Sequence, residues 1–287
     1  MSEPVVRPLS QAGGCVLSGI DLNNLSDDGF SVVEHALHEH LVLVIRDQKL
    51  TPDSFVDFSR RFGKPEPHVI DQFHHADDAN ILVLSNRRDA EDKPLGLADG
   101  GTYFHSDYSY LDVPARCTIL HAIEIPGDDA GTTFANQRAA YESLPEETKR
   151  RIAPLICRHR YGNRDDLDQE SRTAASPLNA DQNSKMHWVR HPLVRIHPKT
   201  GRKALYAVSG SSFGIEGMDD REGVLLLDEL KVHATDPLLC FTPKYRPGDV
   251  VVWDNCTLLH RAPLIAIDRP RTLWRITVKE DQPTLPS

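Results

Sequence analysis

A run of aromatic and hydroxyl residues holds one histidine and one aspartate two positions apart, Thr102-Tyr103-Phe104-His105-Ser106-Asp107-Tyr108-Ser109-Tyr110. This composition predicts a strand, in which alternate side chains share a face, so His105 and Asp107 are expected to point the same way. An imidazole nitrogen and a carboxylate oxygen on one face can bind a metal ion together. A second histidine would complete the two-histidine, one-carboxylate set that holds non-haem Fe(II) with positions left open. The candidate is His260, which follows an apolar run that begins at Val251.

A His-x-Asp pair is weak evidence by itself. With 14 histidines and 42 acidic residues, such pairs arise by chance, and an isolated one is usually a hydrogen-bonded surface pair. Two histidines and a carboxylate also suit Zn²⁺, which keeps a zinc hydrolase open as an alternative. A non-catalytic, metal-stabilised jelly roll that binds an organic acid is a third reading of the same residues.

Composition limits the partners that the chain can have. The net charge of -9 argues against nucleic acid, which requires a basic binding surface. The five cysteines are scattered and odd in number, a pattern typical of reduced thiols in the cytoplasm. No signal peptide or membrane-spanning apolar run is visible. We therefore expect a cytoplasmic protein that binds a small molecule and neither nucleic acid nor a membrane, with a homo-oligomer left open.

Apolar periodicity predicts many short strands and few helices. Strands are expected at 16–20, 41–45, 81–84, 116–125, 132–135, 189–196, 203–208, 239–242, 249–253, 257–261 and 272–278. Helices are expected after the caps Ser26 and Thr51, near 139–144 and at 221–233. This pattern predicts a mainly β protein with flanking helices (α+β), a sandwich or jelly roll, as one domain spanning residues 1–287. The polar segment 161–187 is interpreted as a lid over the site, with a mobile surface loop as the alternative.

Two arginines near the C-terminus complete the observations made from single residues. On a strand, the side chains of Arg271, Leu273 and Arg275 share one face. Guanidinium groups on a buried strand need anions, and each can bind a carboxylate or sulfonate with two hydrogen bonds. The anions could be the protein's own acidic residues or a bound organic acid. A zinc hydrolase would leave both arginines without a role.

The order and spacing of several segments resemble the Fe(II)/2-oxoglutarate-dependent oxygenases grouped with taurine dioxygenase and 2,4-dichlorophenoxyacetate dioxygenase. The resemblance extends from about residue 16 to residue 278. The segments that carry it are 58–63 (Phe-Ser-Arg-Arg-Phe-Gly), 104–107 (Phe-His-Ser-Asp), 131–134 with 138–141, 191–195 with 201–202, 248–255 (Gly-Asp-Val-Val-Val-Trp-Asp-Asn), His260 and Arg271. It implies a double-stranded β-helix, the cupin-like jelly roll.

The resemblance also implies roles for individual residues. Fe(II) would be held by His105, Asp107 and His260. Arg271 would bind the distal carboxylate of 2-oxoglutarate, and Thr133 would donate its hydroxyl to the same group, with Thr132 as the alternative. Further implied residues lie around the substrate: Arg275 at its anionic group, His68 in contact with it, and Tyr108 and Tyr110 on one wall, unless these two tyrosines are core residues.

The implied activity is that of a dioxygenase that uses Fe(II), 2-oxoglutarate and O₂. Hydroxylation of a small anionic carboxylate or sulfonate, with or without later C–O or C–S cleavage, would accompany conversion of 2-oxoglutarate to succinate and CO₂. Desaturation or cyclisation of an amino-acid-derived metabolite in a biosynthetic pathway is the alternative outcome. The chain departs from the family pattern at Phe104, where tryptophan is usual, and at Gly101, where taurine dioxygenase has asparagine. These departures make taurine itself a doubtful substrate.

Overall fold

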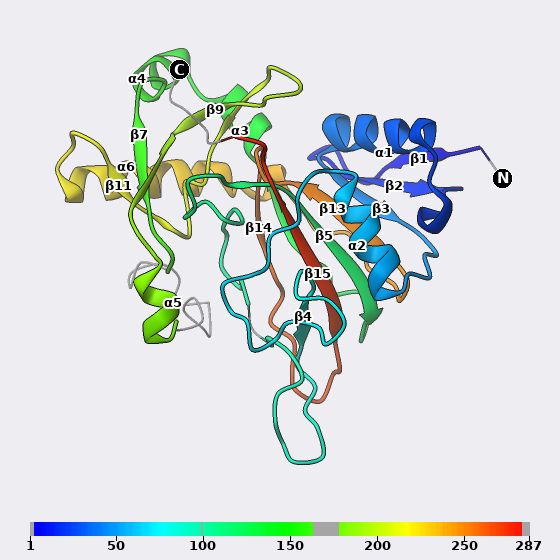
Figure 1. The fold of residues 1–287 in the computed structure, drawn as a ribbon. Helices are drawn as coiled ribbons and strands as arrows, with labels where there is room; N and C mark the ends of the chain where they lie inside the picture. The colour runs from blue at the N-terminus through cyan, green and yellow to red at the C-terminus, as the bar shows by residue number, and fades with distance from the viewer. Residues whose placement is uncertain (1–2, 99, 163–177, 283–287) are drawn as a thin grey trace.

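The computed structural model describes residues 3–98, 100–162 and 178–282. Its main feature is a seven-stranded sheet in which all neighbours are antiparallel except β2 and β3 (Figure 1). In spatial order the strands are β1 (Val5–Pro8), β2 (Cys15–Ser18), β3 (Val42–Ile45), β13 (Val250–Asp254), β5 (Ala115–Glu124), β15 (Thr272–Lys279) and β4 (Leu82–Ser85). The buried strand β3, apolar on both faces, sits inside this sheet as its continuous Val-Leu-Val-Ile sequence predicts.

A three-stranded sheet packs on one face of the main sheet and closes the jelly roll. It consists of β12 (Cys240–Phe241), β6 (Thr133–Asn136) and β14 (Leu258–Arg261). Phe134 and Leu258 from this sheet share a core with Val251, Trp253 and Leu273 from the main sheet. The expected double-stranded β-helix is confirmed.

The remaining strands form an extension beside the jelly roll. A second three-stranded sheet has the order β11 (Ser212–Ile215), β7 (Ile156–His159) and β8 (Val189–Pro192). The strands β9 (Val194–Ile196) and β10 (Lys203–Leu205) form a hairpin and lie within the strands predicted at 189–196 and 203–208.

Helices cover the outer face of the main sheet and one end of the molecule (Figure 1). Helix α1 (Asp27–His40) starts at Ser26, whose hydroxyl accepts the Gly29 N–H, and α2 (Pro52–Arg60) starts at Thr51. Both helices bury their apolar faces against the outer face of the sheet. The other helices are α3 (Gln137–Ser143), α4 (Glu146–Ile152), α5 (Ala180–Ser184) and α6 (Asp220–Ala234), with 3₁₀ turns η1 (Leu22–Asn24) and η2 (Pro237–Leu239). Among the described residues, no helix is both long and apolar enough to cross a bilayer.

The prediction of a strand through residues 102–110 is wrong. His105 forms an isolated β-bridge with His260, and the chain then turns, with Tyr108 at φ 53°. The Asp107 N–H bonds to the side chain of Asn255 instead of a neighbouring strand, because the backbone leaves the sheet at this point.

Most of the predicted lid, residues 163–177, lies outside the described part of the chain.

Candidate active site

Three side chains from two distant segments of the chain lie close together. His105 and Asp107 lie on the loop between β4 and β5, and His260 lies on β14. His105 and His260 exchange both backbone hydrogen bonds, at 3.0 and 2.8 Å, so their imidazole rings stand side by side with centroids 4.2 Å apart. Each Nε2 is 3.5 Å from one oxygen of Asp107. The potential ligand atoms all lie within 4.8 Å of one another.

The donor set and its orientation fit a divalent metal ion. The His105 Nδ1–H donates to the Tyr103 carbonyl at 2.8 Å, so the Nε2 lone pair is directed at the Asp107 carboxylate. Two electron-rich groups facing each other at this distance favour a cation between them. A hydrogen bond from the distal ring nitrogen to a carbonyl is the arrangement that orients a histidine ligand. Two histidines and one carboxylate are the donor set of non-haem Fe(II) sites.

Two glycines make room for the His105 ring. Gly101 and Gly210 both have left-handed backbones, with φ of +74° and +75°. A Cβ on Gly101 would lie 2.5 Å from His105 Cε1, and one on Gly210 would lie 2.8 Å from His105 Cβ. A side chain at either position would displace the imidazole. Gly101, which departs from the taurine dioxygenase pattern, therefore provides the space that the His105 ring occupies.

A buried hydrogen-bond network holds Asp107 in place. Thr118 donates its hydroxyl to Asp107 Oδ2 at 2.6 Å and accepts the Asn255 amide at 2.9 Å. Asn255 Oδ1 accepts the Asp107 N–H at 3.3 Å and the Trp253 indole N–H at 3.1 Å. Sequence reasoning missed Thr118 and gave Asn255 no role. The available signal was a threonine amid the apolar residues of β5.

The electrostatics of the site keep the Asp107 carboxylate ionised and the His260 imidazole neutral. Burial alone would raise the pKa of Asp107, but Arg275, with Nη2 2.7 Å from Oδ1, and the two histidines hold that pKa well below its usual range. Burial lowers the pKa of His260 to about 3. Both groups are thus in the protonation states that metal binding requires.

The predicted face of Arg271, Leu273 and Arg275, formed by β15 and the residue before it, lines the same cavity as the three potential ligands. Arg271, Leu273 and Arg275 all reach it. Arg271 is 7% exposed, donates from Nε to the Ala130 carbonyl at 3.1 Å, and makes no ion pair with any described acidic residue. Burial lowers its pKa to about 10, which leaves the guanidinium charged at neutral pH. An organic carboxylate is the partner that this buried cation lacks.

The two threonines that the resemblance offers for the cosubstrate occupy different environments in the structure. Thr133 starts β6, and its hydroxyl bonds to that of Thr242 at 2.8 Å, away from the cavity lining. Thr132 is buried and lines the cavity with Arg271. The two residues point in opposite directions because successive side chains of an extended chain alternate.

The other predicted substrate residues also line the cavity. His68 accepts the Ile70 N–H at Nδ1, and burial together with Arg275 lowers its pKa to about 3, so the neutral ring carries its proton on Nε2. The Tyr108 hydroxyl donates to the Glu66 carbonyl at 3.1 Å, as the core interpretation expects. Tyr110 packs edge-on against Tyr161, with ring centroids 4.9 Å apart. Of the described residues in the predicted lid segment, Tyr161 and Gly162 line the cavity.

Comparison with known proteins decides the family. A family model described as taurine catabolism dioxygenase TauD, TfdA family matches residues 5–277. The chain belongs to this family. As a TauD/TfdA-family member it is an enzyme, a 2-oxoglutarate-dependent non-haem iron dioxygenase.

Individual relatives of the TauD/TfdA family cover nearly the whole chain. The (S)-phenoxypropionate/alpha-ketoglutarate-dioxygenase of Sphingobium herbicidovorans is 30% identical over 96% of this chain and 95% of its own. The alpha-ketoglutarate-dependent 2,4-dichlorophenoxyacetate dioxygenase of Cupriavidus pinatubonensis is 32% identical, with 96% and 98% covered. Pentalenolactone F synthase of Streptomyces avermitilis is 29% identical, with 98% and 96% covered. A crystal structure of AAD-2 in complex with Mn(II) and N-oxalylglycine matches with a TM-score of 0.79 and 29% identity, covering 99% of this chain and 100% of that one.

Proposed function

We propose that the protein oxidises a small aryloxyalkanoic acid, as a single catalytic domain spanning residues 1–287. The observation that carries the proposal is one cavity that joins the His105–Asp107–His260 cluster to two arginines on one strand face. In this assignment the three residues hold Fe(II), Arg271 and Thr132 bind the distal carboxylate of 2-oxoglutarate, and Arg275 binds the carboxylate of the substrate. When bound, iron and 2-oxoglutarate supply the O₂ activation that oxidises a C–H bond while 2-oxoglutarate becomes succinate and CO₂.

In this proposal Arg271 binds 2-oxoglutarate and Arg275 binds the substrate acid. Arg271 is buried and forms no ion pair with the acidic residues that the structure describes, so its guanidinium can bind a carboxylate in one orientation. Arg275 contacts Asp107 directly, so a substrate anion that binds Arg275 is held beside the metal ligands. Neutral His68 offers an Nε2–H donor on the same wall. A substrate bound by these two groups would have the carbon next to its carboxylate close to the site of oxidation.

The walls around Arg275 favour an aromatic acid. Ile70, Leu97, Tyr103, Tyr110 and Tyr161 line the cavity beside the polar groups. Burial raises the pKa of Tyr161 to about 12, so its ring stays uncharged at neutral pH. An apolar ring with a carboxylate at one end fits an apolar wall with an arginine at one end. The two relatives named for phenoxyalkanoic acids support the same class.

The test combines cosubstrate binding with product analysis. Anaerobic addition of Fe(II) and 2-oxoglutarate is expected to give a weak visible charge-transfer band, which Arg271→Leu weakens by raising the 2-oxoglutarate concentration needed. The substrates to compare are both enantiomers of 2-phenoxypropionate, 2,4-dichlorophenoxyacetate and taurine. Hydroxylation of the carbon that bears the ether oxygen gives a product that collapses to a phenol, so phenol and succinate are measured together.

The outcomes separate the reaction class from the substrate class. Phenol and succinate in equal amounts with an aryloxy acid, and loss of phenol release in Arg275→Leu, support the proposal. Succinate formation without phenol from any aryloxy acid would contradict the substrate class and leave the dioxygenase assignment standing. Absence of the band in iron-loaded protein would contradict the metal and cosubstrate assignment.

A biosynthetic substrate is the second candidate. The observation in its favour is the full-length similarity to pentalenolactone F synthase. Under this alternative Arg275 would bind the carboxylate of a biosynthetic intermediate, and aryloxy acids would not perturb the charge-transfer band. A band that responds to no aryloxy acid, with normal 2-oxoglutarate binding, would favour it.

A further inference from the structure

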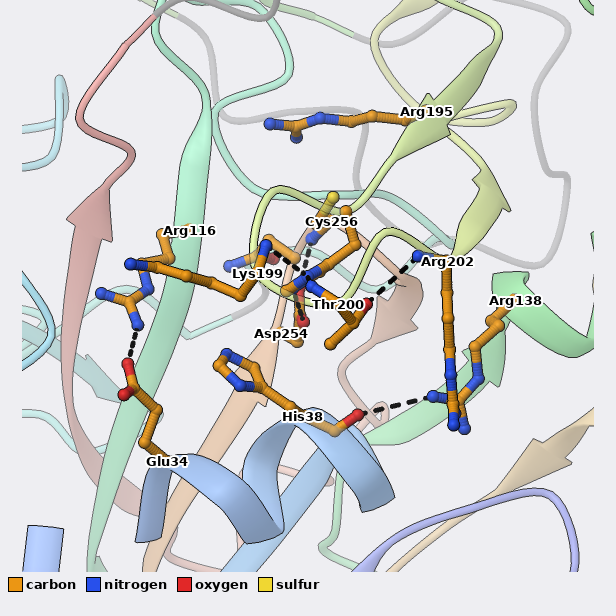
Figure 2. A network of polar contacts seen from close by, with 12 residues as sticks. Glu34, His38, Arg116, Arg138, Arg195, Lys199, Thr200, Arg202, Asp254 and Cys256 are labelled. Carbon is orange, nitrogen blue, oxygen red and sulfur yellow. Dashed lines mark hydrogen bonds and ion pairs between the residues drawn. The ribbon is translucent and has the colours of Figure 1, made fainter. Parts of the chain in front are cut away.

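A second cavity lies beyond the turn that joins β13 to β14, and none of its described lining residues also lines the active-site cavity. It is bounded by the β9–β10 turn, by Arg116 on β5 and by residues 280–282 that follow β15. Asp254, at the end of β13, lines it, whereas the next residue, Asn255, turns inward to Asp107. Figure 2 shows Arg195 reaching in from β9 above Cys256, with Lys199 extending toward Arg116.

The cavity is built around a buried ion pair that leaves hydrogen-bonding atoms unused. Arg195 is 2% exposed and pairs through Nη2 with Glu280 Oε2, whose side chain is 10% exposed. Arg195 Nε and Nη1 and Glu280 Oε1 are buried and have no hydrogen-bond partner among the described residues. The Tyr206 ring lies 4.8 Å from the Arg195 guanidinium and stabilises its face, but a ring cannot satisfy the N–H groups in the guanidinium plane. Buried N–H groups of this kind require acceptors, and the described residues supply none for these two.

The polar groups beside this pair are already occupied by the protein. His197 Nε2 is 2.8 Å from Asp254 Oδ2, and its Nδ1 accepts the backbone N–H groups of Lys199 and Thr200 at 3.1 Å. Asp254 Oδ1 accepts the Cys256 N–H at 2.7 Å. Arg116 bonds to Glu34 and to the Phe62 carbonyl.

Three kinds of group therefore remain for a ligand. They are the two buried donors of Arg195, the buried acceptor of Glu280, and the exposed ammonium of Lys199, which forms no ion pair with a described residue. A carboxylate can accept from Arg195 and Lys199. A donor close to that carboxylate is needed for Glu280 Oε1. A phosphate dianion fits poorly, because Asp254, Glu280 and Asp281 also line the cavity.

We propose that this cavity binds a small carboxylic acid with a hydroxyl or ammonium group on the neighbouring carbon. The carboxylate bonds to Arg195 and Lys199, and the hydroxyl or ammonium donates to Glu280. The site is separate from the catalytic cavity and binds without reaction. Both groups of the ligand are required, because either one alone leaves a buried atom of the Arg195–Glu280 pair unsatisfied.

The experiment uses glycolate and glycine as probes, acetate and methylamine as half-probes, and inorganic phosphate as the competing anion. Titrations of the ¹⁵N-labelled full chain follow the amide signals of Lys199 and Thr200, whose N–H groups bond to His197 at the edge of the cavity. Glycolate, glycine or both are expected to shift these signals at lower concentration than acetate, methylamine or phosphate. If glycine alone binds, the donor is an ammonium; if glycolate alone binds, it is a hydroxyl.

Variants locate the binding. Lys199→Ala, an exposed position that leaves the fold intact, is expected to weaken binding about fivefold, the loss of one partly exposed ion pair. Arg195→Lys is expected to abolish binding, and the exposed Lys49→Ala is the matched control with no effect. Arg271→Leu, in the catalytic cavity, is also expected to leave binding unchanged.

Three outcomes would overturn the proposal. One is no response of Lys199 and Thr200 to either probe, which would mean that water satisfies the buried pair. Another is equal or tighter binding of acetate or phosphate, which would remove the need for a donor group. The third is binding that survives Lys199→Ala unchanged and is lost in Arg271→Leu, which would place the ligand in the catalytic cavity.

Discussion

At the scale of single residues, the absence of a side chain at Gly101 leaves the space in which the His105 ring sits. We expect Gly101→Ala to weaken metal binding by roughly 10–100-fold, the range seen when a ligand's support is removed, because the new methyl group would overlap His105. Gly217→Ala is the matched control, since it has the same φ of +74° and nothing within 4 Å of its Cβ position. Anaerobic titration with Fe(II) or Co(II) measures the affinity. Equal losses in the two variants would mean that backbone strain, rather than contact with His105, causes the effect.

The adjacent threonines provide a second test at this scale. Thr132→Val is expected to raise the KM for 2-oxoglutarate roughly tenfold, because it removes a hydroxyl from the cavity that contains Arg271 and keeps the side-chain shape. Thr133→Val removes a hydroxyl that bonds to Thr242 and should leave this KM unchanged. Steady-state kinetics with varied 2-oxoglutarate distinguish the two. A larger effect of Thr133→Val would restore the assignment that the sequence resemblance gave to that residue.

At the scale of elements, regular strands were predictable from the sequence and the loop between them was not. Leu273 and Arg275 of β15 line one cavity with Arg271, the residue just before the strand, because side chains of an extended chain alternate and these three fall on one side. The same rule fails for the loop after β4, where His105 makes only a bridge and Asp107 sits in a turn. His105 and Asp107 were nevertheless named as metal ligands, first from a strand alternation that this loop does not have and then from the family resemblance. Long-range partners such as Thr118 for Asp107 depend on the register between distant segments, which no local pattern contains.

Strand β5 supports the metal site through one hydroxyl. We expect Thr118→Val to lower metal affinity roughly 10–100-fold, because Asp107 loses its 2.6 Å hydrogen bond and Asn255 loses its acceptor. Thr118→Ser keeps the hydroxyl and is expected to retain most of the affinity. The charge-transfer band with 2-oxoglutarate reports the geometry of the bound metal, and urea unfolding reports stability. If both variants lose stability equally and neither changes the band, Thr118 is a packing residue of β5.

At the scale of the whole molecule, the extension beside the jelly roll contains a buried polar cluster. His159, His191 and Tyr206 lie in ring contact, with centroids 5.3 to 6.3 Å apart, and are almost fully buried. Both nitrogens of His159 lack hydrogen-bond partners among the described residues. Burial holds the pKa of His159 well below its usual range and lowers that of His191 to about 4. The folded protein therefore keeps both rings neutral at pH values where an unfolded chain would protonate them.

This difference in proton binding makes stability depend on pH. Below about pH 6.5, His159 and His191 become protonated in the unfolded state but stay neutral in the folded state. The free energy of unfolding therefore falls as the pH is lowered toward 4, by about 1.4 kcal/mol per pH unit for each histidine. His159→Phe removes one of these groups and replaces an unpaired polar ring by an apolar one of similar shape, which is tolerated at neutral pH. Urea unfolding of the metal-free protein between pH 4 and pH 7 is expected to show a shallower pH dependence in His159→Phe, by about 1.4 kcal/mol per pH unit. The exposed His35→Asn is the control and should leave the slope unchanged. An unchanged slope in His159→Phe would mean that His159 is protonated in the folded state and that an unseen acceptor, such as a buried water, stabilises its charge.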